Sequence, residues 1–331
     1  MAAYCTNAIL KGLKYSPGDQ ILLCNLHTYP AVLNQAKVVV EQNPGVEIVF
    51  IDIRFPVNSK EDLITPFTKA LEENPNIKIA VIDHISCGST ILFPVKEIID
   101  LCHQYDVLSL VDGAHAAGQI PLSIEEYDAD YYVGNLCKWM MVPQNVGFLW
   151  VHPKHQATFR SLATSHSDFL PTFRDRFYSA ITKDRLPQVI VKDALEFHKS
   201  LGGLESISPR NSELVTKAAS MLSKAWNTPE LEVSPELRAP FMSMVAFPDG
   251  LDAVYQGRTR HDVAYDLILR GVHTRVCPID GKFWCRLSCN VWNDMDDFEK
   301  LRDAVLDLIK EKTDNPGGDS MKFFIPCPPQ G

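Results

Sequence analysis

The sequence lacks any long hydrophobic run: no apolar stretch in its 331 residues approaches the roughly 20 residues that a membrane-spanning helix needs. The first residues also lack the basic segment followed by an apolar segment that marks a secretory leader. Internal repeats are absent as well. With 46% hydrophobic and 22% charged residues, the composition predicts a soluble globular protein with one large domain and a smaller one.

Runs of basic residues are missing too, and the net charge is −9 with a pI near 5.6. This charge disfavours nucleic acid and acidic membrane surfaces as partners, so the expected partner is a small molecule. The nine cysteines lack CxxC pairs and regular spacing, which argues against a disulfide framework or a zinc site. We interpret them as reduced thiols, and the predicted location is the cytoplasm. The cysteines occupy positions 5, 24, 87, 102, 137, 277, 285, 289 and 327.

Strand-like and helix-like segments alternate through the first half of the chain. The run 107–111 is apolar apart from Ser109, which is typical of a parallel strand covered by helices on both faces. The pattern predicts an α/β fold with a mostly parallel sheet between helices. The predicted strands are 20–25, 46–53, 77–84, 107–111, 131–134 and 146–151, and the predicted helices are 31–41, 61–72 and 95–105.

The pattern changes after about residue 153. A polar segment leads into a helix predicted over 186–201 and ended by Gly202-Gly203, and later helices alternate with short strands. The later helices are predicted at 212–226, 260–271 and 296–311, and the strands at 241–247 and 284–288. The predicted organisation is a large α/β domain over 1–200, a smaller C-terminal α+β domain over 201–313 and a Pro/Gly-rich tail over 314–331.

Two charged residues frame the central stretch of the chain. Asp112 ends an apolar strand, where open α/β sheets bind ligands, although an aspartate there also serves as the N-cap of a following helix. Lys138 follows a second strand and precedes Trp139, so its stem is expected against apolar surface; burial makes such an amine nucleophilic. Taken alone, a lysine at this position is usually a solvated surface residue. The two ends suggest a cofactor held between a carboxylate and an amine.

Several short motifs occur in a fixed order. They are Asp83-His84-Ile85-Ser86, Pro94-Val95-Lys96-Glu97-Ile98, Val111-Asp112-Gly113-Ala114-His115-Ala116, Asp130-Tyr131-Tyr132, Asn135-Leu136-Cys137-Lys138-Trp139, and Arg286-Leu287-Ser288 with Trp292-Asn293. Together they resemble the class V aminotransferase family of fold-type I pyridoxal-phosphate enzymes, over nearly the whole chain. The similarity is greatest to the isopenicillin N epimerase-like branch; cysteine desulfurases are also members. The implied cofactor is pyridoxal 5'-phosphate.

The resemblance implies roles around the cofactor ring. Lys138 corresponds to the lysine that forms the Schiff base and later moves the substrate Cα proton. Asp112 corresponds to the partner of the pyridinium nitrogen, and His115 lies where the family places a Gln or His near the ring oxygen. His27 resembles the aromatic residue that stacks on the ring, with Tyr29 as the alternative.

Further positions follow from the same resemblance. Arg286 is similar to the arginine that binds the substrate carboxylate, for which its planar fork is suited. Thr182 resembles the threonine that reaches the phosphate of the neighbouring subunit, although the family's preceding glycine is absent. Asn135 and Ser86 are predicted cofactor contacts, and Ser86, like Ser89, is equally compatible with a turn.

The chain departs from the family at its start. The family's phosphate-binding loop precedes a helix that here begins at about Met1, and residues 1–4 offer no hydroxyl before Tyr4. The helical segment 2–13 also has no cap before it. Two explanations compete: an incomplete sequence of a working enzyme, which we favour, or a shortened homologue with weakened cofactor affinity. Cys137 and Cys87 stand where relatives often have histidine and asparagine.

The predicted activity is that of an enzyme acting at Cα of an amino acid or a substituted cysteine, as a C–S lyase, an epimerase or an aminotransferase-like enzyme, and the first two are favoured. Desulfurase chemistry needs a mobile nucleophilic cysteine; Cys277, predicted in a loop before Arg286, is the candidate, but its neighbours match that pattern poorly. The rival is a catalytically silent homologue acting as a binding or scaffold protein. The resemblance also implies a homodimer.

Overall fold

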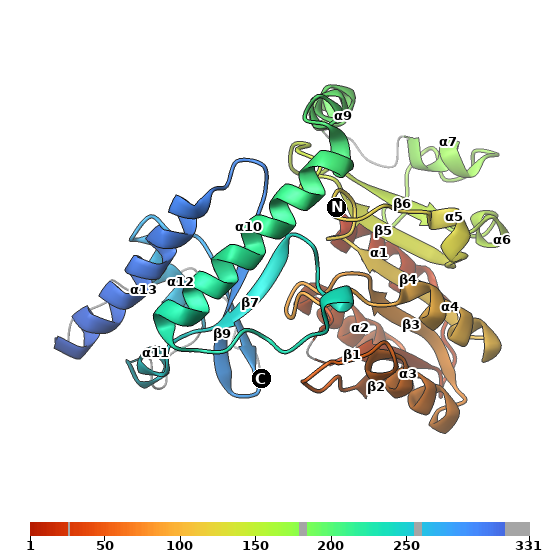
Figure 1. The fold of residues 1–331 in the computed structure, drawn as a ribbon. Coiled ribbons are helices and arrows are strands. Elements are labelled where there is room, and N and C mark those ends of the chain that lie inside the picture. The colour runs from red at the N-terminus through yellow and green to blue at the C-terminus, as the bar shows by residue number, and fades with distance from the viewer. Residues whose placement is uncertain (26, 179–183, 255–259, 315–331) are drawn as a thin grey trace.

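A six-stranded sheet in the order β2-β1-β3-β4-β5-β6 forms the larger part of the molecule (Figure 1). The computed structural model describes residues 1–25, 27–178, 184–254 and 260–314. The first five strands run parallel and β6 is antiparallel to β5. The strands are β1 (Gln20–Cys24), β2 (Glu47–Ile51), β3 (Ile77–Asp83), β4 (Leu108–Gly113), β5 (Tyr131–Asn135) and β6 (Gly147–Val151).

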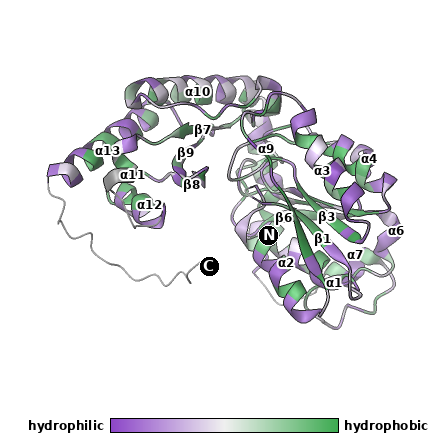
Figure 2. Cartoon of the chain, turned by 90° about the horizontal axis from the view of Figure 1, so that it is seen from below, coloured by the Kyte–Doolittle hydropathy of each residue, from purple (hydrophilic) through white to green (hydrophobic). Residues whose placement is uncertain are grey.

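Helices cover both faces of this sheet because its strands are apolar on both sides. Along β1, Ile21 and Leu23 pack with α1 (Ala2–Gly12) and α2 (Pro30–Gln42), whereas Leu22 and Cys24 pack on the opposite face with α3 (Glu61–Glu73) and α4 (Val95–Gln104). In Figure 2, β1 and β3 are largely green and the surrounding helices carry both colours. The predicted mostly parallel sheet between helices is confirmed.

A second, antiparallel sheet lies towards the C-terminal end, in the order β7-β9-β8. Its strands are β7 (Met242–Ala246), β8 (Arg275–Ile279) and β9 (Lys282–Ser288). One face packs against α10 (Gly203–Trp226) and α13 (Met295–Asp314), whereas Met244, Cys277 and Trp284 on the other face join the core beneath α3 and α4. The small sheet is therefore held between its own helices and the large sheet, which confirms the predicted α+β character of this part.

The remaining elements are short, apart from α9 and α12. They are α5 (Ile124–Tyr127), α6 (Pro153–Gln156), α7 (Phe173–Tyr178), α8 (Leu186–Val189), α9 (Val191–Ser200), η1 (Pro235–Leu237), α11 (Asp249–Val254) and α12 (Arg260–Ile268). Within the described ranges, no helix has the length and apolarity to cross a membrane. The tail beyond Asp314 lies outside the described residues.

Three expectations about elements were wrong in detail. The helix predicted over 186–201 is divided into α8 and α9 at Ile190. Helix α10 begins at Gly203 rather than 212 and contains Pro209, because Ile207 in its first turns is buried against Trp139 and Phe241. Strand β8 was missed because Pro278 interrupts its apolar pattern, but β8 is an edge strand, where a missing N–H is tolerated.

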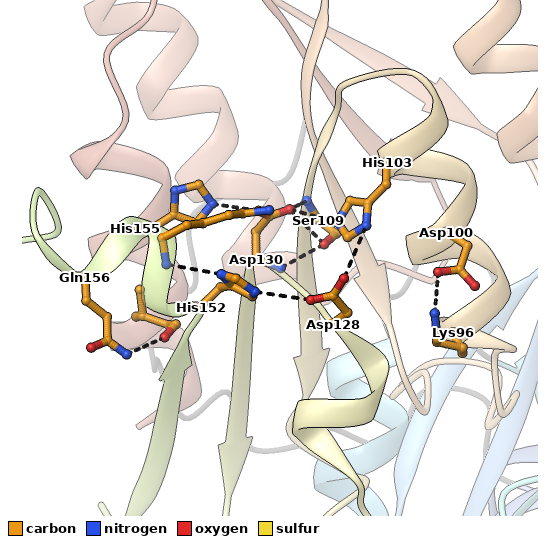
Figure 3. Close-up of polar contacts among 11 residues, drawn as sticks. Lys96, Asp100, His103, Ser109, Asp128, Asp130, His152, His155 and Gln156 are labelled. Atoms are coloured by element: carbon orange, nitrogen blue, oxygen red, sulfur yellow. Dashed lines mark hydrogen bonds and ion pairs between the residues drawn. The ribbon is translucent and has the colours of Figure 1, made fainter.

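A buried polar cluster around Asp130 joins β4, β5 and the segment after β6 (Figure 3). Its Oδ2 accepts hydrogen bonds from the backbone N–H and hydroxyl of Ser109, at 2.9 and 3.1 Å. Its Oδ1 lies 2.8 Å from Lys154 Nζ and 2.6 Å from His155 Nε2. Burial alone would raise the pKa of Asp130, but the bonds from Lys154, Ser109 and His155 lower it to about 2. Asp130 therefore stabilises the fold as an ionised carboxylate.

We expect Asp130→Asn to lower the free energy of unfolding by roughly 2–4 kcal/mol at pH 7, because an amide cannot accept from all these donors. The depressed pKa means that this stabilisation is present above pH 4 and is lost as the pH falls towards 2. Urea unfolding at pH 7 and at pH 3 measures both effects, and the difference from wild type should shrink at pH 3. Asp128→Asn is the matched control: that side chain is 56% exposed, and we expect a change within about 0.5 kcal/mol.

Candidate active site

A cavity of about 610 Å³ lies where the carboxyl ends of β3, β4 and β5 approach the small sheet. Its lining residues come from distant parts of the sequence. Among the predicted site residues, the cavity wall contains Asp112, His115, Asn135, Lys138 and Arg286, together with the alternative stacking residue Tyr29. The structure therefore brings a carboxylate, an amine and a guanidinium to one enclosed space.

Asp112 ends β4 and is buried, with 6% of its surface exposed. Its Oδ1 accepts a hydrogen bond from the backbone N–H of Ala114 at 3.0 Å. Turns rather than a helix follow, so the alternative that Asp112 caps a helix is wrong. The intervening Gly113 allows this chain reversal beside the core, because a Cβ there would lie 2.3 Å from the Tyr132 ring.

A second carboxylate, Asp83, lies beside Asp112 because the parallel register of β3 and β4 pairs the two residues. Asp83 also lines the cavity, and its buried Oδ2 has no hydrogen-bond partner in the described structure. Burial, and then the neighbouring Asp112, raise the pKa of Asp83 well above its usual value. Burial raises the pKa of Asp112 too, but the Ala114 N–H and the Lys138 charge oppose this. Of the two acids, Asp83 therefore has the more strongly raised pKa.

Lys138 lies in the turn that follows β5. One hydrogen bond closes this turn, and a second comes to the Lys138 backbone from a residue far along the chain. The N–H of Met140 donates to Leu136 O at 3.1 Å, and the side-chain amide of Asn290 donates to Lys138 O at 3.3 Å. Burial lowers the pKa of Lys138, and Asp112 partly offsets this. The amine therefore has a larger neutral, nucleophilic fraction than a surface lysine.

His115 reaches the cavity from the turns after β4 rather than from a helix. It is 6% exposed, its Nδ1 has no hydrogen-bond partner in the described structure, and its ring centroid lies 6.2 Å from that of Trp139. Burial lowers the pKa of His115 well below its usual value, and the charges of Lys138 and Arg286 add to this. The imidazole is therefore neutral and can donate or accept one hydrogen bond.

Arg286 enters from β9, on the face of the small sheet that is turned towards the large sheet. Its Nη1 donates to the backbone oxygen of Cys87 at 2.9 Å, whereas its buried Nε has no partner within the described residues. Burial lowers the pKa of Arg286, yet an arginine remains charged. The anchored fork is suited to a carboxylate in the cavity.

The structure does not bring His27 and Ser86 to the cavity wall. His27 is buried, its Nδ1 lies 2.5 Å from Ser89 Oγ, and its ring contacts Phe55 and Phe93. Ser86 Oγ accepts from the N–H of Ser89 at 3.1 Å and belongs to this same buried network. Tyr29, 39% exposed and at the cavity, is better placed to stack on a bound ring than His27.

The amino end of α1 forms another part of the wall, through Met1, Ala2 and Ala3. Asn135 Oδ1 accepts the N–H of Ala2 at 2.9 Å, so Asn135 orients the start of this helix instead of pointing a free amide oxygen at a ligand. A helix start supplies N–H groups for an anion, as the resemblance predicted for the cofactor phosphate. Thr182, the other predicted phosphate contact, lies outside the described residues.

The expectation that Cys277 lies in a loop was wrong. It lies within β8, is 4% exposed and belongs to the core shared with the large sheet. The cavity is lined instead by Cys87, and burial raises the pKa of that thiol to about 11. Cys277 therefore lacks the exposure, and Cys87 the low pKa, of a nucleophilic cysteine.

Among the acids and arginines of the cavity wall, two were not predicted as site residues, namely Asp83 and Arg275. Asp83 stood in a quoted motif, and its signal was a second strand ending in aspartate beside the one that ends in Asp112. Arg275 lies on β8. Because that strand was not predicted, no sequence pattern placed Arg275 at the cavity. Both have a buried side-chain atom, Asp83 Oδ2 and Arg275 Nε, that lacks a partner in the described structure.

The chemical groups on the cavity wall provide a test of whether the cavity suits pyridoxal phosphate. A ring carrying a nitrogen, a hydroxyl and an aldehyde needs an acid near the nitrogen, a neutral hydrogen-bonding group near the hydroxyl and an amine for the aldehyde. Asp112, His115 and Lys138 supply these groups around one space. Their donor set therefore fits the cofactor.

Comparison with known proteins supports the same assignment. The model of the family "Aminotransferase class-V" matches residues 2–272. A putative L-cysteine desulfhydrase 1 of Oryza sativa subsp. japonica is 31% identical over 90% of this chain and 66% of its own length, and an L-cysteine desulfhydrase of Arabidopsis thaliana is 28% identical over 90% and 70%. The chain thus spans about two thirds of the length of these relatives.

Among solved structures, an apo cysteine desulfurase from Thermococcus onnurineus NA1 superimposes with a TM-score of 0.74, at 17% identity, over 94% of this chain and 78% of that one. At this identity the likeness shows the shared fold. The family match covers most of the sequence and includes Asp83, Asp112 and Lys138. The chain therefore belongs to the class V aminotransferase family of pyridoxal-phosphate-dependent enzymes.

Proposed function

We propose that this protein is a C–S lyase that releases sulfide from cysteine or a thiol from a substituted cysteine. The reaction with cysteine consumes one water and yields pyruvate, ammonia and hydrogen sulfide. The observation that carries the proposal is a cavity that combines Lys138, Asp112 and Arg286, and whose lining cysteine among the described residues, Cys87, is a buried thiol with a pKa raised to about 11. The relatives' L-cysteine desulfhydrase names support the same reaction.

Each residue at the cavity has a role that follows from its chemistry. Arg286 binds the α-carboxylate through its guanidinium fork and so orients the Cα–H bond. Lys138 would hold the cofactor through its Nζ, and the same amine would take the Cα proton of the substrate. Asp112 would hold the ring nitrogen of the cofactor. Bound pyridoxal phosphate supplies the electron sink for the pair left at Cα.

The lack of a reactive thiol separates elimination from desulfurase chemistry. A desulfurase transfers the substrate sulfur to an enzyme thiolate, and this needs a mobile cysteine with a low pKa. Cys277 is fixed in β8, and Cys87 has a pKa raised to about 11. Neither of these two cysteines therefore suits the role of sulfur acceptor, and this favours pyruvate and sulfide as products.

A product assay decides between these reactions. The chain is purified with pyridoxal phosphate and incubated with L-cysteine, and pyruvate, sulfide, alanine and racemised cysteine are quantified. Equal amounts of pyruvate and sulfide are expected. Alanine with protein-bound persulfide would show a desulfurase, and racemisation alone an epimerase. Failure of the chain to take up the cofactor would favour the rival scaffold function.

We also infer a homodimer, as the family resemblance implied. Helices α8 and α9 present large apolar side chains to solvent, including Leu186, Val189 and Phe197 at 67%, 71% and 52% exposure. Several exposed large apolar side chains on two successive helices are typical of a subunit contact. Light scattering should give a mass of two chains for wild type and of one chain for Val189→Glu. A monomeric wild type would contradict the inference.

A further inference from the structure

The cavity contains a second arginine that the proposed reaction does not use. Arg275 on β8 and Arg286 on β9 are register partners across an antiparallel pair, so both side chains leave the same face of the small sheet. Both line the cavity with Lys138. The Nε atoms of both are buried without a hydrogen-bond partner in the described structure.

The two guanidinium groups differ in what holds them. Arg286 is anchored by its hydrogen bond to Cys87 O at 2.9 Å. Arg275 makes no side-chain hydrogen bond or ion pair with the described residues, and both cavity acids lie elsewhere, at the ends of β3 and β4. Arg275 is partly buried as a residue, but its Nε is fully buried, and a buried polar atom without a partner is costly unless a ligand supplies one. Arg275 is therefore the stronger candidate for an unassigned ligand contact.

A neighbouring cavity of about 570 Å³ extends this positive region. It shares Arg275, Arg286 and His273 with the first cavity and adds Arg260 and Lys300 to its wall. Its described acid, Asp297, is already engaged: its Oδ2 accepts from the Asn293 side-chain amide at 2.9 Å. The space beside the α-carboxylate site is thus predominantly cationic.

The size of this space also exceeds what cysteine alone requires. Each of the two cavities falls within the roughly 300–1,000 Å³ that is typical of pockets for larger organic ligands. One α-carboxylate can satisfy one arginine fork, which leaves the second fork unpaired. A substrate with an additional anion on its side chain would fill the space and pair the second fork.

We propose that the preferred substrates are S-substituted cysteines that carry a second anionic group, such as a carboxylate or sulfonate, and that Arg275 binds this group while Arg286 binds the α-carboxylate. This inference rests on the proposed C–S lyase function for the end of the substrate near Lys138. Arg275 then determines specificity, because an uncharged substrate side chain of the same shape leaves the guanidinium of Arg275, with its buried Nε, unpaired.

The test compares S-carboxymethyl-L-cysteine with S-carbamoylmethyl-L-cysteine, which have similar shapes and differ by one negative charge. Calorimetry on the full chain without cofactor should give a Kd lower for the carboxymethyl compound by roughly 10- to 100-fold, as expected for a charge-assisted hydrogen-bonded pair. Arg275→Gln should bring this ratio near one, and Arg275→Lys should leave an intermediate ratio. The loaded enzyme should show the same order in kcat/KM for pyruvate release.

Two further variants separate the roles of the charges. Arg286→Gln should weaken both ligands by similar factors, because both carry the α-carboxylate. Lys310→Gln removes one exposed charge of the same sign from α13, outside both cavities, and should keep the wild-type ratio. Melting curves confirm that each variant is folded; Arg275→Lys retains the charge and serves where Arg275→Gln does not fold.

A wild-type ratio near one, a ratio that persists in Arg275→Gln, or no binding of either ligand overturns the proposal. Failure of the C–S lyase function would appear differently, as a chain that takes up no cofactor or releases no pyruvate. The calorimetric ratio needs neither cofactor nor turnover. The two failures are therefore distinguishable.

Discussion

Replacing Lys138 with alanine is expected to abolish both the covalent attachment of pyridoxal phosphate and the release of pyruvate, with a loss of at least about 10⁴-fold in kcat. Two functions disappear together, because the same Nζ both anchors the cofactor and accepts the Cα proton. Borohydride reduction followed by intact-mass measurement should show a cofactor adduct on wild type, mapped to Lys138, and no adduct on the variant.

Lys138→Arg is the matched control for charge. Its guanidinium keeps the positive charge in the cavity but cannot act as the amine nucleophile, so it should be as inactive as Lys138→Ala. Because burial lowers the pKa of Lys138, adduct formation should persist to a lower pH than for a surface lysine, and should decline as the amine becomes protonated. Wild-type turnover by either variant would show that the described cavity is not the active site.

Asp112→Asn is expected to lower kcat by roughly 10²- to 10³-fold, the usual cost of removing one preorganised electrostatic contact from an active site. The amide carries no charge, so a ring nitrogen beside it loses the partner that favours its protonated form. The variant should still attach the cofactor through Lys138. Steady-state pyruvate release gives kcat, and visible absorbance confirms loading.

The neighbouring acid provides a control within the same buried pair. Burial and the neighbouring Asp112 raise the pKa of Asp83 well above its usual value, so we expect an uncharged amide to be tolerated better at position 83 than at position 112. We expect Asp83→Asn to lose less than about ten-fold in kcat, consistent with a conservative change beside the reacting groups. Equal losses in Asp83→Asn and Asp112→Asn would contradict the assignment of the negative charge to Asp112.

The linear sequence was most informative where a functional residue directly follows a regular element. Asp112 ends an apolar run and Lys138 follows another, and the structure places both at the carboxyl ends of neighbouring strands. Arg286 lies on a strand that the sequence also predicted. Parallel strands explain this success, because their carboxyl ends meet at one edge of the sheet.

The choice between His27 and Tyr29 shows where local information ends. Both follow β1 and both are aromatic, so sequence position alone did not separate them. Contacts with Phe55 and Phe93 bury His27, whereas Tyr29 immediately precedes Pro30 at the start of α2 and reaches the cavity. Packing partners far along the chain therefore decide which of the two side chains lines the cavity.

The amino-acid sequence by itself determined the elements of the α/β layers and placed a carboxylate and an amine after two strands, because apolar periodicity and strand ends are local properties. Its resemblance to the family then identified the ligand of these groups as a pyridoxal ring. Only the tertiary structure decided that Asp83 pairs with Asp112, that Cys277 is fixed in an edge strand, and that Arg275 stands beside Arg286. Strand register and the contact between two sheets depend on burying side chains that are distant in sequence, and this non-local packing sets the charge of the site.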